Sequence, residues 1–242
     1  MAETRYRQFC PVAMASELLC TRWTMVLVRE LVAGSTRFNA LRRGVPRMSP
    51  ALLAKRLRDL EAAGVVRRVP VPDEPGVCAY ALTEAGRDLA GVVEAVGRWG
   101  QRWVSAELSL ANLDAALLMW DMRRNLDPEA LPRRRATILF QYPERPPAER
   151  RWWLVATPGE PVDLCAVDPG FEVDLYVSTD LRTMTEIWLG LATVADAIDG
   201  DRLYVHGARE LEEAMPRWLG LSPFAGVEKR GRAEPGRWAT ER

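Results

Sequence analysis

Basic side chains gather in one short stretch of this chain, and their type and spacing point most directly to chemistry. Residues 37–68 hold nine Lys and Arg against two Asp and Glu, a net charge of +7 (9 − 2) over 32 residues. A local positive field of this kind attracts polyanions such as DNA. On charge alone, a solvated helical face explains the same residues equally well.

The pattern SPALLAKRLRDLEAAG predicts the helix that carries the centre of this stretch. Ser49 is expected to cap the helix, Pro50 suits its first position, and Gly64 ends it. Three leucines at spacings of four and three form an apolar stripe for a core: Leu53, Leu57 and Leu60. The opposite face and its flank carry Ala51, Lys55, Arg58, Leu52 and Arg56. The helix therefore offers one face to a core and a basic face to a partner.

The remaining reactive residue types exclude most catalytic and metal chemistry. His206 is the only histidine, which excludes Ser-His-Asp triads, HExxH sites and most His-metal chemistry. The four cysteines, Cys10, Cys20, Cys78 and Cys165, are widely spread without a CxxC pair, which fits a reducing cytosol. Cys78 and Cys165 lie in strand patterns and are expected to be buried. We expect no enzyme, no metal and no cofactor.

Length and charge distribution indicate two domains. The chain has 242 residues, of which 48% are hydrophobic, and no run approaches the ~18 apolar residues of a membrane span. Residues 1–107 carry 16 Lys and Arg against 11 Asp and Glu, whereas residues 108–242 carry 17 against 22. We expect a cytoplasmic protein without membrane insertion, with domains over 1–107 and 108–228 and a disordered tail over 229–242.

The elements around the basic helix follow an ordered series. The expected members are two helices within 11–33, a short helix over 38–43, strands over 65–70 and 78–83, and a long helix from 83 to 108. Thr24 is expected to be the N-cap of the second helix. Helix, turn, basic helix, two-stranded wing and long apolar helix is the order of a winged helix-turn-helix domain.

Specific motifs strengthen this interpretation. Residues 9–104 contain a Cys-Pro-Val start, an Arg-Trp-Thr junction, an Arg-Phe-Asn-Ala-Leu-Arg segment, a Ser-Pro-x-Leu-Leu helix and a Tyr-x-Leu-Thr-x-x-Gly close. Together they closely resemble the HxlR family of bacterial transcriptional regulators. The resemblance implies a homodimer on an inverted-repeat operator in double-stranded DNA. It also implies that Ser49–Ala63 is a recognition helix in the major groove, with the hairpin at the neighbouring backbone or minor groove.

Charge, position and this resemblance together define the expected DNA-binding residues. They are Arg37, Arg42, Arg43, Arg47, Ser49, Ala51, Leu52, Lys55, Arg56, Arg58, Arg67 and Arg68. The wing departs from the family pattern, in which a basic residue often precedes the second strand. Here Asp73 and Glu74 stand in the hairpin and are expected to repel phosphate. Arg67 and Arg68 at the wing base are the expected replacement.

The long helix carries more apolar surface than one small domain covers. Its expected dimerisation residues are Leu89, Val92, Val96, Trp99 and Trp103. A partner chain explains this surface economically, and packing on the second domain is the alternative.

The second half predicts an α+β domain with a mostly antiparallel or mixed sheet of about five strands backed by helices. A helix is expected over 108–131. A strand, an Asp-containing turn, a helix ending in Gly, a short helix ending in Asp-Gly and a strand ending in Gly follow one another along the chain. With this order, residues 108–225 resemble the sterol-carrier-protein type of domain. The resemblance implies an apolar cavity for a hydrophobic small molecule. The candidate lining residues, for which ordinary core is the alternative, are Leu118, Met122, Trp153, Met184, Trp188 and Leu191.

Three functional hypotheses follow. The first is an HxlR-type regulator modulated by a hydrophobic effector in the second domain. The second is a redox-responsive regulator, because Cys10 matches the position where some HxlR members use a thiol sensor, and Arg5 and Arg7 lie nearby. A passive cysteine is the alternative there. The third is a carrier of hydrophobic ligands that does not read DNA.

Overall fold

The chain divides into two compact units, Met1–Gly97 and Arg98–Arg242. The computed structural model describes residues 6–72, 74–104 and 110–230. The predicted domain boundary between 107 and 108 lies outside these residues, as does the predicted tail beyond residue 230.

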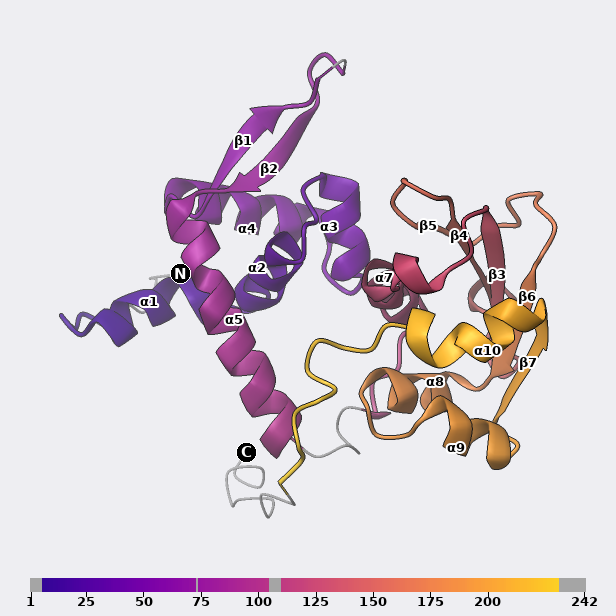
Figure 1. Cartoon of the computed structure of the whole chain (residues 1–242). Helices are drawn as coiled ribbons and strands as arrows, with labels where there is room; N and C mark the ends of the chain where they lie inside the picture. Colours follow the sequence, from indigo (N-terminus) through magenta and orange to yellow (C-terminus); the bar gives the residue numbers. More distant parts are fainter. Residues whose placement is uncertain (1–5, 73, 105–109, 231–242) are drawn as a thin grey trace. The chain divides into compact units, whose positions relative to one another are not determined.

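The first unit has the predicted winged helix-turn-helix order (Figure 1). Its elements are α1 (Pro11–Leu19), α2 (Thr24–Val32), α3 (Phe38–Gly44), α4 (Pro50–Ala62), β1 (Val66–Pro70), β2 (Cys78–Leu82) and the start of α5 (Glu84–Trp103). β1 and β2 pair antiparallel from Val66↔Leu82 to Pro70↔Cys78 and form the wing. The backbone N–H of Tyr80 also donates to the carbonyl of Thr36 at 2.8 Å, which ties the wing to the entry of α3.

The basic helix α4 forms for the reasons that its sequence indicates. The Ser49 hydroxyl accepts a hydrogen bond from the Leu52 N–H at 3.3 Å, and Pro50 occupies the first turn. Gly64 follows the helix with φ of +73°, a conformation that glycine adopts without steric cost. The stripe of Leu53, Leu57 and Leu60 is fully buried in the core of the unit.

The start of α2 differs from the prediction. Thr24 is not the N-cap but the first helical residue, and it is buried. The N-cap is Trp23, whose backbone is left-handed with φ of +76°. Its side chain makes no capping hydrogen bond to the helix. The helix therefore begins at Thr24, one residue earlier than an N-cap at Thr24 implies. A left-handed bulky residue costs about 1–3 kcal/mol and persists only where its surroundings hold it.

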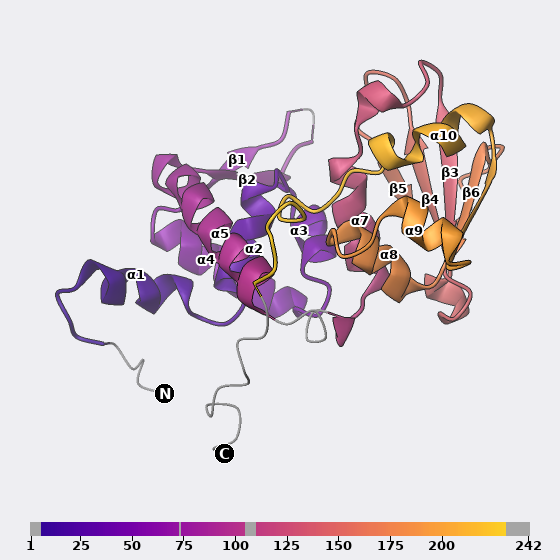
Figure 2. The same cartoon turned by 60° about the horizontal axis from the view of Figure 1, so that its bottom comes forward.

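The second unit is a mixed five-stranded sheet covered by helices, as predicted (Figure 2). Its strands are β3 (Ala136–Gln141), β4 (Arg151–Ala156), β5 (Asp163–Cys165), β6 (Leu175–Thr179) and β7 (Leu203–Gly207), in the order β5-β4-β3-β6-β7. Among these described strands, β3 and β6 pair in parallel and the other neighbours pair antiparallel. The helices are α7 (Ala115–Asn125), α8 (Leu181–Trp188), α9 (Val194–Asp199) and α10 (Arg209–Trp218), with 3-10 turns at Pro128–Ala130 and Pro147–Glu149.

The predicted helix over 108–131 is shorter in the structure. α7 begins after Asp114, whose carboxylate accepts from the Leu117 N–H at 3.0 Å, and it ends at Asn125. Pro128 then starts a separate 3-10 turn, because proline cannot donate to the ladder of a continuing helix. Residues 108 and 109 lie outside the described part of the chain.

One face of the sheet builds the core of the second unit. Side chains alternate along a strand, so every second residue points to the same face. Six such residues of the three central strands pack with the helices: Ile138, Phe140, Trp152, Leu154, Leu175 and Val177. They meet residues of all four helices, among them Met119, Met184, Ala197 and Trp218.

Candidate nucleic-acid interface

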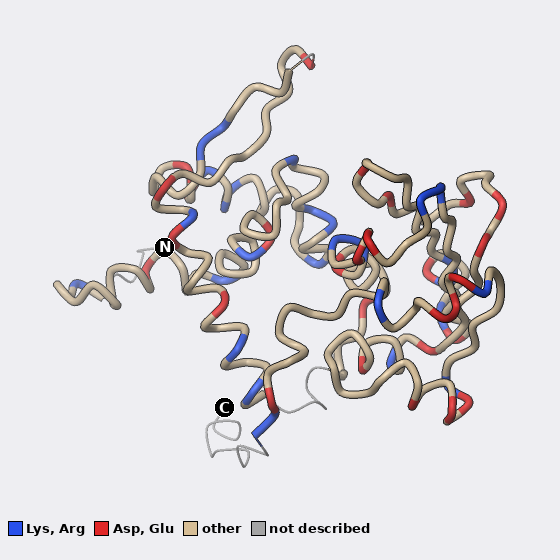
Figure 3. The backbone as a smooth tube through the Cα atoms, viewed as in Figure 1, with Lys and Arg blue, Asp and Glu red and all other residues tan. Residues whose placement is uncertain are grey.

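The outer face of α4 is the centre of the candidate interface. Ala51, Lys55 and Arg58 are exposed on this helix, opposite the buried leucine stripe. Figure 3 shows further basic positions on α3 and at the base of the wing. A helix held by apolar contacts on one side and basic on the other suits insertion into a groove of DNA.

Asp59 organises two of these cations and was missed as a site residue in the sequence. Its Oδ2 accepts from Lys55 Nζ at 3.0 Å and from Arg56 Nη1 at 2.9 Å, one turn away on the same helix. Burial raises the pKa of the Asp59 carboxyl, but the hydrogen bonds from Lys55 and Arg56 outweigh it, so this pKa lies below its ordinary value. Asp59 follows Arg56 by three positions and Lys55 by four, and this spacing in the sequence indicates ion pairs along one side of a helix.

The wing tip carries an ion pair instead of a free acid. Both nitrogens at the end of the Arg37 side chain donate to the Glu74 carboxylate, with Nη1 at 2.9 Å from Oε2. The hydrogen bond from Arg37 lowers the pKa of Glu74, and the same bond raises the pKa of Arg37. The charge of Glu74, one of the two acids expected to repel phosphate, is therefore paired within the first unit. Residue 73 lies outside the described residues.

Seven of the nine predicted cations fall into two groups, and the other two, Arg43 and Arg47, have interaction partners of their own. Arg37, Lys55 and Arg56 are held by the acids above, and Arg68 Nε lies 3.3 Å from Glu61 Oε2. Within the described part of the chain, no hydrogen bond or ion pair of the side chains of Arg42, Arg58 and Arg67 is found. Arg42, Arg58 and Arg67 can therefore bind an external anion without breaking an internal contact.

A buried charged cluster fixes the helices that support α4. Glu30 is completely buried, and its carboxylate pairs with Arg29 Nη2 at 2.7 Å and accepts from the Ser35 hydroxyl at 3.1 Å. Arg29 also donates to the carbonyl of Gly44 at 3.2 Å, which links α2 to the end of α3. A Cβ on Gly44 would fall 1.9 Å from Cδ of Glu30, so only glycine fits. The signal in the sequence was a glutamate among the apolar positions of 24–32.

The apolar stripe of α5 is largely exposed. Val92, Val96, Trp99 and Trp103 are 41%, 51%, 59% and 39% exposed, whereas Leu89 packs partly on the core of the first unit. Their spacing of 3-4-3-4 places them on one side of the helix. α1 contains no buried residue at all, and Val12 and Met14 on it are 73% and 61% exposed.

The candidate lining residues of the second unit do not share one face. Leu118, Met122, Met184 and Trp188 belong to the helix-covered core, but Trp153 does not. Trp153 alternates with Trp152 and Leu154 along β4 and therefore points to the other face of the sheet. The expectation that it lines the same cavity is wrong for this reason. Leu191 is half-buried, just after Gly190.

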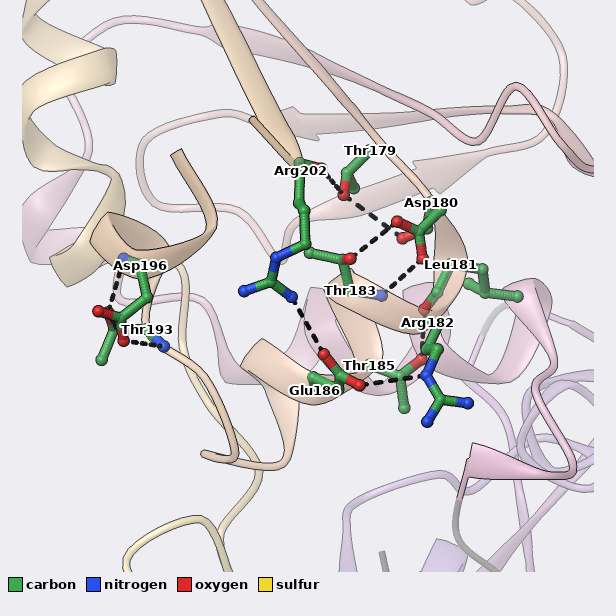
Figure 4. Close-up of polar contacts among 10 residues, drawn as sticks. All are labelled: Thr179, Asp180, Leu181, Arg182, Thr183, Thr185, Glu186, Thr193, Asp196 and Arg202. Atoms are coloured by element: carbon green, nitrogen blue, oxygen red, sulfur yellow. Dashed lines mark hydrogen bonds and ion pairs between the residues drawn. The ribbon is translucent and has the colours of Figure 1, made fainter. Parts of the chain in front are cut away.

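Polar contacts around α8 explain the carboxylates of the second unit (Figure 4). Asp180 caps α8 through the Thr183 N–H at 2.8 Å, and Thr193 with Asp196 forms a capping box on α9. Hydrogen bonds from Thr193 lower the pKa of Asp196. Glu186 accepts from Arg182 and from Arg202, both at 3.2 Å. These contacts cap α8 and α9 and pair Glu186 of α8 with two arginines. The described residues include no group of three or more His, Cys, Asp or Glu that could bind a metal ion.

The four cysteines, all within the described part of the chain, form no disulfide, and their burial differs in part from expectation. Cys10 is half-buried at the N-cap position of α1, and Cys20 is exposed at the other end of that helix. Cys165 is half-buried, but Cys78 is exposed. Cys78 stands at the start of β2, opposite Pro70, where the two-stranded wing has no further layer to cover it. The described helices include none long and apolar enough to cross a membrane.

Comparison with known proteins agrees with this geometry. The winged fold and its basic helix define a DNA-binding helix-turn-helix unit, and residues 18–108 match the model of the HxlR-like helix-turn-helix family. YvaP of Bacillus subtilis (strain 168), named an uncharacterized HTH-type transcriptional regulator, is 34% identical over 98 residues, covering 40% of this chain and 91% of that protein. The chain belongs to the HxlR-like helix-turn-helix family.

Two further similarities cover the same part of the chain. The uncharacterized HTH-type transcriptional regulator sll1512 of Synechocystis sp. is 34% identical over 98 residues, covering 40% of this chain and 73% of that protein. A solved structure, the reduced form of the transcriptional regulator YodB from B. subtilis, is 32% identical with a TM-score of 0.35, covering 39% of this chain and 93% of its own. All these matched proteins are named as regulators of transcription.

Proposed function

We propose that this protein is a homodimeric, cytoplasmic transcriptional regulator that binds an inverted-repeat operator in double-stranded DNA through α4. The observation that carries the proposal is the exposed basic face of α4, with Lys55 and Arg58, set directly on the buried leucine stripe. Its place inside the HxlR family match supports the same conclusion. Lys and Arg contacts to phosphates supply the affinity, and contacts to base edges supply the selectivity.

The proposed interface extends from α4 to both neighbouring elements. The recognition helix with its N-cap provides Ser49, Ala51, Leu52, Lys55, Arg56 and Arg58. The N-cap of α3, α3 itself and the turn after it provide Arg37, Arg42, Arg43 and Arg47, and the wing provides Arg67 and Arg68. The free N–H groups at the start of α4 suit a phosphate beside Ser49. Arg42 and Arg67 are expected to bind phosphates on either side of the groove.

The proposed dimer forms through α5. Val92, Val96, Trp99 and Trp103 present a continuous exposed apolar stripe, and stripes at this spacing pair with a second helix. Leu89 joins the stripe to the core of its own unit. Two copies would place two α4 helices on half-sites about one turn of DNA apart.

The proposed role of the second unit is to bind a hydrophobic effector in a sterol-carrier-like fold. Four of the candidate lining residues lie together in its core, including Met122 and Met184. Methionine side chains adapt to bulky apolar ligands as well as to one another. Solvent extraction of the purified protein followed by mass spectrometry tests this role. A stoichiometric apolar compound supports it, and none across several expression conditions contradicts it.

Fluorescence anisotropy tests the DNA-binding function. The purified protein is titrated with the duplex upstream of its own gene and with a scrambled duplex of equal composition, over a series of salt concentrations. The proposal predicts tight binding to the upstream duplex with a steep salt dependence. Equal, weak binding to both duplexes together with a stoichiometric apolar ligand favours the alternative of a ligand carrier that does not read DNA.

A redox function through Cys10 is the second candidate. Cys10 is a free thiol at the N-terminus of α1, the helix that has no buried residue. A change of oxidation state there is expected to alter the packing of α1 and so the geometry of the dimer. If oxidants release DNA from the wild type and equally from Cys10→Ser, the redox function of Cys10 is excluded.

A further inference from the structure

The side chain of Arg56 is tied into the first unit rather than extended from it. Its Nε donates to the carbonyl oxygen of Arg22 at 3.2 Å, and its Nη1 donates to Asp59 Oδ2 at 2.9 Å. The Arg56 side chain is only 15% exposed, against 57% for its neighbour Lys55. Two adjacent cations on one helix therefore have different surroundings.

The acceptor on Arg22 lies at the junction between α1 and α2. Trp23 is the N-cap of α2, and its carbonyl already accepts the first helical hydrogen bond, from the Leu27 N–H at 2.9 Å. The carbonyl of Arg22 precedes this ladder and needs another donor. Arg56, 34 residues further along the chain, supplies it. This bond joins the recognition helix to the left-handed turn between α1 and α2.

The geometry requires an arginine at position 56. A guanidinium presents several N–H groups in a rigid planar fork, so one side chain donates in two directions at once. A lysine ammonium on a flexible stem satisfies one of the two acceptors with good geometry, not both. Asp59 completes the arrangement by holding Arg56 from within α4 and drawing Lys55 along the same helix.

We propose that Arg56 is a positioning residue for DNA recognition: it docks α4 against the α1–α2 turn and neutralises no phosphate. The proposal rests on the DNA-binding function proposed above. It separates Arg56 from Arg58, which lies two positions away and is exposed without an internal partner among the described residues. Arg58 contributes charge to the interface, whereas Arg56 fixes the orientation in which that interface meets the bases.

The salt dependence of DNA binding distinguishes these two roles. Arg56→Gln and Arg58→Gln each remove one positive charge from the same helix. Binding is measured by anisotropy with a duplex selected by the wild type from a random library and with its scrambled counterpart. Each lost phosphate contact flattens the slope of log K against log [salt] by about 0.9. We expect Arg58→Gln to flatten the slope on both duplexes.

For Arg56→Gln we expect an unchanged slope and an affinity ratio between the two duplexes reduced about tenfold, because misplaced side chains lose base discrimination. A slope flattened as in Arg58→Gln overturns the proposal, and so does an unchanged ratio. A wild type that selects no duplex overturns the DNA-binding function itself, which is a separate result.

A conservative variant keeps the test valid if Arg56→Gln unfolds. Arg56→Lys retains the charge but serves only one acceptor. We expect a folded protein by circular dichroism, a wild-type salt slope and a duplex ratio between those of the wild type and Arg56→Gln. Full recovery of the ratio by lysine contradicts the proposal, because a simple phosphate contact accepts either cation.

Discussion

The two units of this protein place their polar chemistry differently. In the first unit, apart from the buried Glu30 and its partner Arg29, most charged groups lie outside a small apolar core. Acids such as Asp59 and Glu74 hold some cations there, while Arg58 has no partner among the described residues. In the second unit, the carboxylates mainly cap and tie helices, as Asp180 does for α8. The first unit is therefore organised to meet an external polyanion, and the second to enclose apolar side chains.

Reversing the charge of the outer face of α4 is expected to have the largest effect on DNA binding. Lys55→Glu with Arg58→Glu is expected to weaken DNA binding on the order of 10³-fold, because two contacts are lost and two repulsions are added. Anisotropy measures the affinity, and light scattering verifies that the mass is unchanged. The matched control is Arg209→Glu, an exposed reversal in the second unit that should leave binding unaltered. Unaltered binding by the double variant removes α4 from the interface.

Truncating a core side chain is expected to destabilise each unit separately. Leu57→Ala should lower the free energy of unfolding of the first unit by about 3 kcal/mol, and Met184→Ala should do the same to the second, because both side chains are fully buried. Amide hydrogen exchange resolved along the chain reports each unit. Leu52→Ala, at a half-buried position of α4, is the control and should cost clearly less. An equal cost at both leucines contradicts the assigned faces.

Disruption of the stripe on α5 is expected to have a smaller effect. Trp99→Glu should raise the dimer dissociation constant at least about tenfold, because a charge replaces a large apolar contact. Sedimentation equilibrium measures it. Ala90→Glu, at an exposed position on the other side of α5, should leave the dimer intact. If both variants remain dimeric to the same degree, the stripe is not the interface.

The smallest predicted effect concerns the wing. Glu74→Gln releases Arg37 and should strengthen binding to any duplex a few-fold, with a salt slope steeper by up to about 0.9. Because the pKa of Glu74 is lowered by Arg37, acid produces the same release only below the ordinary range of a glutamate. Glu84→Gln, an exposed acid at the start of α5, is the control. Weaker binding by Glu74→Gln means that the pair positions the wing instead.

Local patterns explain which features the sequence could predict. Ser49, Pro50 and Gly64 are boundary residues with specific backbone roles, and the leucine spacing identified the buried face of α4. The left-handed Trp23 was not predictable, because tertiary contacts and not intrinsic preference hold a bulky residue there. The Arg37–Glu74 pair joins residues 37 positions apart, beyond the reach of helical periodicity.

In the second unit, strand periodicity carries information that residue type does not. Strand alternation already separates Trp153 from Trp152 and Leu154, so the candidate lining set mixed two faces of the sheet. Apolar residue types alone do not distinguish a ligand cavity from a filled core, because both use the same side chains. The exposure of Cys78 depends on the absence of a covering layer over the wing strand, which the strand pattern does not encode.

Footprinting on a selected duplex tests whether two copies of α4 read DNA. The measurement is hydroxyl-radical footprinting combined with interference by guanine N7 methylation. A dimer with one α4 in each half-site predicts two protected patches about 10 bp apart, with interference at guanines in the major groove of each patch. A single patch, or binding that is insensitive to major-groove methylation at every guanine of the site, would contradict it.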